Sequence, residues 1–223
     1  MIVKKSKLLL LSIIMSLSPS ISYARIYSIA GYDLNIDSQK HTFNTVFAGM
    51  FWNPLERLSL LGNLSYYSDS LGDRVGSIGL QFYIPVSNPF ILQLSINGSS
   101  GLNNSYNAGI GSIGGIVYIS RLISFNTRFY YYSDNYAYDF FKLYDSLYFT
   151  LLNKLGIEAG AMYYFTSMPN NYPVLFAEID CRLWKLILYS RFTYYPFPLQ
   201  LATSNYQDIN TLNNISAGIF IRY

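Results

Sequence analysis

Several charged residues in the second half of the chain have a spacing that lets them act together. Glu178, Asp180 and Arg182 follow one another at intervals of two, and Arg191 comes next among the charged strand residues. Residues two apart lie on the same face of an extended strand, so one face would carry charges of both signs. Such charges form ion pairs where they meet, and where they face water they attract one sign of ion and repel the other.

Catalytic and metal-binding chemistry has little support in the sequence. The only histidine is His41, and Asp69 and Ser70 could complete a catalytic trio with it, but no flanking motif accompanies them. Cys181 is the only cysteine, so an internal disulfide is excluded, and one cysteine with one histidine does not support a metal cluster. We predict no catalytic residue, no metal and no cofactor.

The elements that must position the charged residues are β-strands. Apolar and polar residues alternate with a period of two in segments 77–86, 90–98 and 123–131. Leu92 and Leu94, for example, alternate with Gln93 and Ser95. This pattern indicates strands with one apolar and one polar face. No stretch of about 18 apolar residues follows residue 24, so a membrane-spanning helix is not expected.

Short and long connections take turns between these strands. The short ones fall at 53–57, 86–89, 120–122, 153–155 and 184–185. The longer polar ones fall at 37–41, 68–75, 99–107, 133–140, 167–172 and 197–210. This alternation is typical of bacterial outer-membrane barrels, which have short periplasmic turns and longer external loops.

Residues 25–223 are therefore predicted to form one all-β domain, a transmembrane antiparallel up-and-down β-barrel of about twelve strands. Ten or fourteen strands remain as alternatives. The sequence leaves the register open in the glycine-rich segment 109–115 and around Asp145.

Residues 1–24 have the composition of a cleaved secretory signal. Three lysines precede a short apolar stretch, and small residues end at Ala24, which predicts cleavage between Ala24 and Arg25. Removing three of the 15 basic residues leaves 12, equal to the 12 acidic residues, so the net charge of +3 disappears. Binding to nucleic acid is therefore not expected.

Tyrosines cluster near one end of alternate strands. Tyr66, Tyr131, Tyr163 and Tyr194 each lie just before a predicted external loop, on strands that run outward. At such a height the ring lies among acyl chains and the hydroxyl among headgroups, which predicts an aromatic girdle in contact with outer-membrane lipid and lipopolysaccharide. The alternative is that tyrosine simply favours strands.

The chain ends in SAGIFIRY. Ser216, Gly218, Ile221 and Tyr223 fit the pattern polar-x-Gly-x-x-apolar-x-aromatic, with the aromatic residue last. These eight residues resemble the assembly signal of bacterial outer-membrane barrels. The resemblance implies that the barrel-assembly machinery is a partner during biogenesis and that the bacterial outer membrane is the final location.

Parity assigns most charged strand residues to the barrel interior, because a charge that faces lipid near the midplane is costly. A turn at 184–185 would place Glu178 opposite Arg191, and the same reasoning brings Glu158 near Arg182. The residues predicted to line the lumen are Arg128, Glu158, Glu178, Asp180, Arg182, Tyr189 and Arg191.

The two rims are predicted to differ in sign. The external loops receive mostly aspartates, together with the cations Lys40, Arg74 and Lys142, whereas the periplasmic rim receives mainly arginine and lysine. An acidic mouth would favour cations or bind divalent ions that bridge lipopolysaccharide. Ordinary solvated loops explain the same residues.

The predicted function is passive diffusion of small hydrophilic solutes through a narrow channel. In length, strand number and charged inner walls the chain resembles the small monomeric twelve-stranded porins for acidic sugars, which implies a monomer. Those porins carry an excess of arginine in the lumen, whereas this lumen is mixed.

Two alternatives stay open. The inner charges could neutralise one another in a closed barrel whose loops serve a structural or adhesive role. His41, Asp69 and Ser70 resemble by type the trio of the palmitoyltransferase barrel, so an outer-membrane lipid hydrolase or acyltransferase using His41 is the other. The His-x-Ser pattern of barrel phospholipases and lipid A deacylases is absent, because Thr42 and Phe43 follow the histidine.

Overall fold

The computed structural model describes residues 26–37, 40–55, 58–70, 72–136, 139–151, 154–165, 173–194 and 213–222. Among these residues, no helix has the length and apolar character needed to cross a membrane. The predicted signal, its cleavage site at Ala24 and Arg25, and the terminal Tyr223 lie outside the described ranges.

The described residues form twelve strands. Their bounds are β1 Ile26–Asp37, β2 Thr42–Leu55, β3 Leu58–Asp69, β4 Arg74–Ser87, β5 Phe90–Gly101, β6 Asn107–Tyr118, β7 Ile123–Asp134, β8 Asp139–Leu151, β9 Leu155–Phe165, β10 Pro173–Leu183, β11 Leu186–Tyr194 and β12 Asn213–Arg222.

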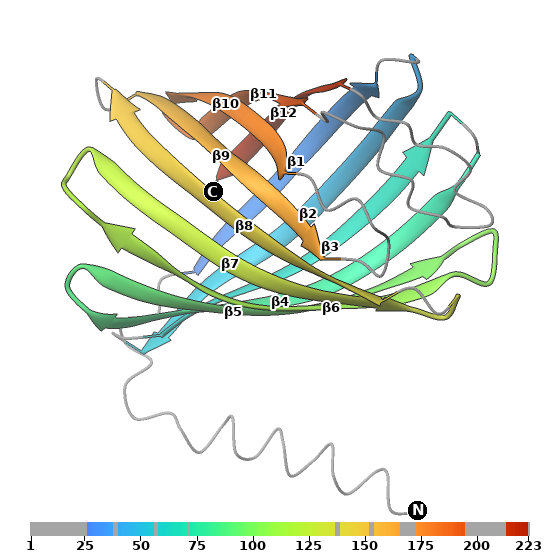
Figure 1. Cartoon of the computed structure of the whole chain (residues 1–223), viewed down its shortest axis with the longest axis horizontal. Coiled ribbons are helices and arrows are strands. Elements are labelled where there is room, and N and C mark those ends of the chain that lie inside the picture. Colours follow the sequence, from blue (N-terminus) through green and yellow to red (C-terminus); the bar gives the residue numbers. More distant parts are fainter. Residues whose placement is uncertain are drawn as a thin grey trace, which may run out of the picture.

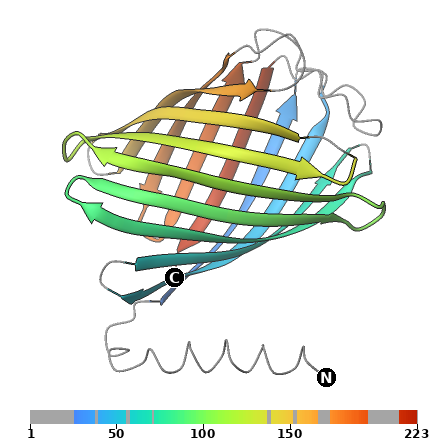
Figure 2. The ribbon, with the colours of Figure 1, turned by 60° about the horizontal axis from the view of Figure 1, so that its bottom comes forward.

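Each strand pairs antiparallel with the next one along the chain, and β1 pairs with β12, so the sheet closes into a barrel. Figure 1 shows β1 in blue beside β12 in red, and Figure 2 shows the strands inclined around the closed wall. The prediction of an all-β, twelve-stranded, up-and-down barrel is confirmed.

The connections are mostly longer at one end of the barrel than at the other, as predicted, with one tie: four residues join β6 to β7 and four join β7 to β8. Short turns join Ser87 to Phe90 and Leu183 to Leu186 at one end of the barrel, while Gly101 and Asn107 are joined by a longer loop at the other. Odd strands therefore all run toward the end with the longer loops.

The two faces of the sheet have opposite character. Large hydrophobic side chains such as Ile78 and Ile96 are exposed, each at 63%, whereas polar side chains such as Gln93, at 2%, are buried. This inverts the pattern of a water-soluble protein, and it fits a barrel whose outer face lies in lipid.

Glycines allow the inner wall to pack closely at particular points. A Cβ added at Gly114 on β6 would collide with the backbone oxygen of Thr127 and lie 2.7 Å from the Cα of Arg128, both on β7. A Cβ at Gly111 on the same strand would meet nothing within 4 Å. The two glycines therefore form a matched pair, one required by packing and one not.

We expect Gly114→Ala to destabilise the barrel by about 1–3 kcal/mol, because backbone atoms must move to admit the methyl group. Gly111→Ala should be neutral or stabilise by about 0.4–1 kcal/mol, since it only restricts the unfolded chain. Urea-induced unfolding in lipid vesicles measures both free energies. Equal effects of the two substitutions would contradict the assigned packing.

Candidate functional site: the charged inner wall

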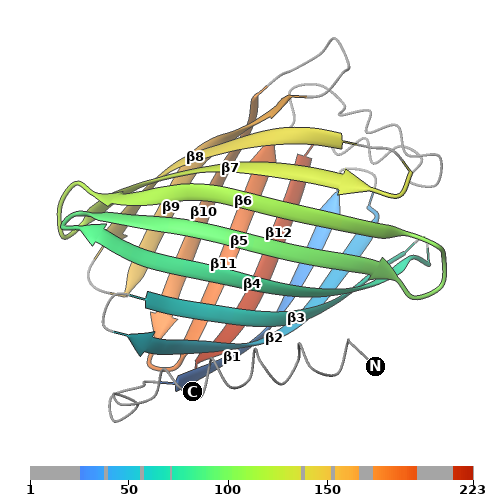
Figure 3. The same cartoon turned by 90° about the horizontal axis from the view of Figure 1, so that it is seen from below.

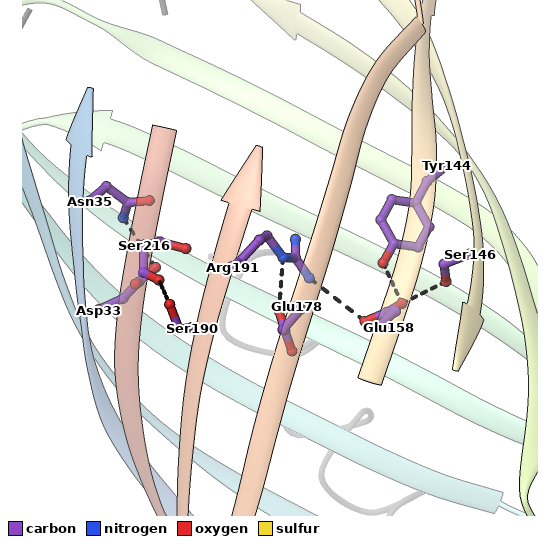
Figure 4. Close-up of polar contacts among 9 residues, drawn as sticks. All are labelled: Asp33, Asn35, Tyr144, Ser146, Glu158, Glu178, Ser190, Arg191 and Ser216. Atoms are coloured by element: carbon purple, nitrogen blue, oxygen red, sulfur yellow. Dashed lines mark hydrogen bonds and ion pairs between the residues drawn. The ribbon is translucent and has the colours of Figure 1, made fainter. Parts of the chain in front are cut away.

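The largest group of charged contacts joins four neighbouring strands on the inner face (Figure 4). We call it the inner-wall cluster; its members are Tyr144, Ser146, Glu158, Phe176, Glu178 and Arg191. Arg191 Nε donates to Glu178 Oε2 at 2.8 Å, and its Nη2 lies 3.8 Å from Glu158 Oε2. One guanidinium therefore bridges two carboxylates.

Neutral groups hold the cluster in place. The hydroxyls of Tyr144 and Ser146 each donate to Glu158 Oε1 at 2.6 Å. The Arg191 guanidinium lies over the Phe176 ring, 4.7 Å from its centroid, and Tyr144 stacks on the same ring at 5.1 Å. Hydrogen bonding and stacking together fix the orientation of the arginine.

The strand register explains this geometry. Glu178 is the cross-strand partner of Arg191, as the two-residue turn at 184–185 predicts. The prediction that Glu158 lies near Arg182 is wrong, because β9 pairs with β10 so that Glu158 stands opposite Glu178. The two carboxylates are thus neighbours, and Arg191 compensates both.

Arg182 belongs to a separate group nearer the short turns. Its Nε donates to Asp180 Oδ1 at 3.1 Å, and its Nη2 donates to the Tyr148 hydroxyl. The same hydroxyl donates to Asp180 Oδ2 at 2.7 Å. Gly156 on β9 leaves the room that this contact needs, since a Cβ there would collide with both Tyr148 and Asp180.

Arg128 lies on another wall and is held by amides. Its Nε and Nη2 donate to Oε1 of Gln93, the former at 3.1 Å, across β6. With its amide turned to satisfy both neighbours, Gln81 accepts from Arg128 Nη1 at 2.8 Å and donates to the Tyr83 hydroxyl at 2.9 Å. Among the described residues no carboxylate pairs with Arg128, so its charge is not compensated locally.

The prediction that Lys142 lies in an external loop is wrong. It is the fourth residue of β8 and lies between two tyrosines, with Nζ 4.4 Å from the ring centroid of Tyr130 and 5.8 Å from that of Tyr164. Polar residues near the start of β8 suggested that the loop continued further, but the strand already begins at Asp139.

The remaining predicted lumen residue, Tyr189, lies near the seam between β1 and the last strands. Its ring passes over Gly218 on β12, where a Cβ would collide with it, and its hydroxyl hydrogen-bonds Asp33 on β1. Ser216 is buried at this seam, opposite Arg191 in the register. Gly218 thus has a packing role, whereas its role as part of an assembly signal stays a prediction.

The tyrosines of the predicted girdle share one position in the barrel. All four are exposed on the outer face and lie within a few residues of the loop end of an odd strand, and they are Tyr66, Tyr131, Tyr163 and Tyr194. Contact with lipid headgroups at this height stays a prediction.

The residues considered for catalysis have structural partners. Asp69 accepts from the Tyr67 hydroxyl at 3.0 Å and from the backbone N–H of Asp73 at 2.9 Å. The Ser70 hydroxyl accepts from the backbone N–H of Thr42 at 3.3 Å. These contacts brace the ends of β2 and β3. Over the described residues, no group of three or more His, Cys, Asp or Glu side chains could hold a metal ion.

Sequence reasoning missed the neutral members of these groups. Gln81, Gln93, Tyr144 and Ser146 lie on the inner face at positions that the period-two pattern already marks. The pattern predicts whether a side chain faces the lumen or the lipid. It does not predict the hydrogen-bond partner, because a long side chain can contact a residue two strands away.

Solved structures with a similar fold include outer-membrane channels. A KdgM porin matches with a TM-score of 0.67 at 9% identity, covering 86% of this chain and 98% of that chain. The NanC porin matches with a TM-score of 0.61 at 8% identity, covering 89% and 99%. An outer-membrane channel from Pseudomonas putida F1 matches with a TM-score of 0.59 at 8% identity, covering 89% and 95%.

The fold is that of a porin-like outer-membrane barrel. It agrees with the expected location in the bacterial outer membrane. No protein-family model matches the sequence, and no curated protein matches it either.

We expect Arg191→Met to destabilise the barrel by about 1–3 kcal/mol, because Glu158 and Glu178 would face each other without a compensating charge. Arg182→Met is the control: it removes a guanidinium that is 47% exposed and leaves one carboxylate, Asp180, which keeps its hydrogen bond from the Tyr148 hydroxyl. It should cost at most about 1 kcal/mol. Adding Glu158→Gln to Arg191→Met should restore part of the loss. Urea unfolding in vesicles measures all three, and no recovery in the double variant would contradict the bridging role of Arg191.

Proposed function

We propose that this protein is an outer-membrane channel for the passive diffusion of small hydrophilic solutes. The observation that carries the proposal is the solvent exposure of charged inner-wall side chains. Arg191 is 31% exposed and Arg182 is 47% exposed, although both lie on the face away from lipid. A barrel filled tightly by its own side chains would bury such groups.

The distribution of charge in the lumen supports a selective path rather than a neutral one. Arg128 projects from β7 with only amide and aromatic partners among the described residues, whereas Glu158 and Glu178 lie on β9 and β10. Figure 3 shows β4–β7 in front and β10–β12 behind them, so these groups come from different walls. Solutes would pass between fixed charges of opposite sign.

The comparisons support the channel at the level of architecture. One KdgM porin structure is a complex with disordered oligogalacturonate. At 8% identity that likeness gives the fold and does not carry over a solute. The mixed charge of this lumen leads us to propose small hydrophilic solutes in general, with the exposed outer face in contact with lipid and lipopolysaccharide.

The test is electrical. The refolded chain without residues 1–24 should give reproducible conductance steps in a planar bilayer. Arg128→Gln should raise the cation-to-anion permeability ratio about two- to fivefold, because one unit charge beside a narrow aqueous path contributes roughly 0.5–1 kcal/mol. The reversal potential in a salt gradient reports this ratio.

Arg121→Gln is the matched control, since it removes the same charge from an exposed turn residue outside the strands. Its reversal potential should stay close to that of the unmodified chain. A folded barrel that shows no conductance at any voltage would reject the open channel and favour a closed barrel that acts through its loops.

A further inference from the structure

One charged side chain faces outward where the barrel should meet hydrocarbon. Asp145 is the seventh residue of β8, which runs from Asp139 to Leu151. It shares its face with Phe141 and Leu147, which are exposed hydrophobic residues on the same strand. Its parity is opposite to that of the inward-facing Ser146, so the carboxylate lies on the lipid side, near mid-height.

The carboxylate has no compensation of the kind that inner-wall charges receive. In the described part of the chain, no hydrogen bond or ion pair reaches Asp145, whereas Glu158 has two hydroxyl donors and an arginine. An outward charge near the bilayer midplane is unfavourable. Ionisable residues within a membrane almost always pair with another polar group, and they mark functional sites.

The surroundings of Asp145 permit a close approach. Its cross-strand partners are Thr127 on β7 and Ala161 on β9. Ala159 and Ala177 are paired on the next two strands and face the same way. The outer face is thus low on the side of the carboxylate toward Ala161, while Phe129 and Leu147 near it are exposed and project further.

We propose that this face, made of Thr127, Asp145, Ala159, Ala161 and Ala177, binds the same face of a second copy of this chain in the membrane. Thr127 and Asp145 are direct neighbours on adjacent strands. A twofold axis along the membrane normal exchanges left and right, so it brings Asp145 of each copy toward Thr127 of the other. Because the strands are inclined, these neighbours differ in height by roughly 3 Å, an offset that the two side chains must span. Each threonine hydroxyl then donates to a carboxylate, and both contacts form at once.

Self-complementarity favours a second copy over another occupant. Lipid acyl chains offer no donor, and an unrelated membrane protein would need a donor at the matching height. The chain itself supplies the donor at Thr127. The proposal concerns the outer face and is independent of the proposed channel, and it departs from the monomer that the sequence predicts.

The experiment measures self-association in lipid vesicles by energy transfer between two labelled pools. The label is placed at Arg121→Cys, in an exposed turn next to β7, in a Cys181→Ser background so that it is the only thiol. Folding of each variant is checked by its resistance to unfolding in detergent. The labelled parent should show energy transfer that rises with protein density in the bilayer.

Two single substitutions and their combination test the contact itself. In the dimer, Thr127→Asp places a carboxylate of one copy against Asp145 of the other. Asp145→Thr removes the carboxylate from both copies and leaves threonine against threonine. Each should raise the dissociation constant at least about tenfold, because two hydrogen bonds to charged groups are lost. The double variant Thr127→Asp with Asp145→Thr exchanges the two residues and should return the dissociation constant to that of the parent.

Asp139→Asn, at the exposed start of β8, is the control and should have no effect. The proposal is overturned if the parent stays monomeric at every density, or if both single variants associate as strongly as the parent. It is equally overturned if the exchanged double variant does not recover, because Asp145 would then meet something other than Thr127 of a second copy.

Discussion

Pairing between β1 and β12 is the constraint on which the rest of the structure depends. Within hydrocarbon no water satisfies backbone N–H and C=O groups, so a sheet that crosses a membrane must have no open edge. The register from Ile29 with Arg222 to Asp37 with Asn214 supplies the last ladder. Gly31 permits this approach, since a Cβ there would collide with the Phe47 ring and lie 2.6 Å from the backbone oxygen of Ile219. Closure then divides every strand into an inner and an outer face.

The two faces solve different energetic problems. Outside, exposed aliphatic and aromatic residues suit lipid, and the outward carboxylate of Asp145 is the group that we propose to meet a second copy. Inside, charges are tolerated because they meet water, hydroxyls, amides or each other. Arg191 illustrates this most fully, with two carboxylates, one aromatic ring and partial exposure to solvent. The inner wall thus carries charges of both signs.

Much of the fold follows from period-two alternation and loop length, which depend only on local sequence. That is why the strand count, the pairing of Glu178 with Arg191 and the outward position of Tyr66 and Tyr131 could be predicted. The position of Glu158 could not, because the register of β9 on β10 is set across a longer loop. Lys142 was misplaced because polar residues at the start of a strand read like a loop. The partners of Arg128 could not be predicted either, because its side chain extends across β6 to Gln93 on β5, and no local sequence pattern specifies such a contact.

The central claim is that one face of each strand meets water and the other meets lipid, and β10 allows a direct measurement of this. Each position from 174 to 183 would be replaced in turn by cysteine in a chain whose Cys181 is serine, and the native chain would report on position 181. The proteins in vesicles would then be treated with a small hydrophilic thiol reagent. The account predicts that cysteines in place of Glu178, Asp180 and Arg182 react with the reagent. Cysteines in place of Leu175, Ala177 and Ile179, and the native Cys181, should not react. Protection along the whole strand would contradict a water-filled lumen, and reaction at every position would contradict the assignment of the outer face to lipid.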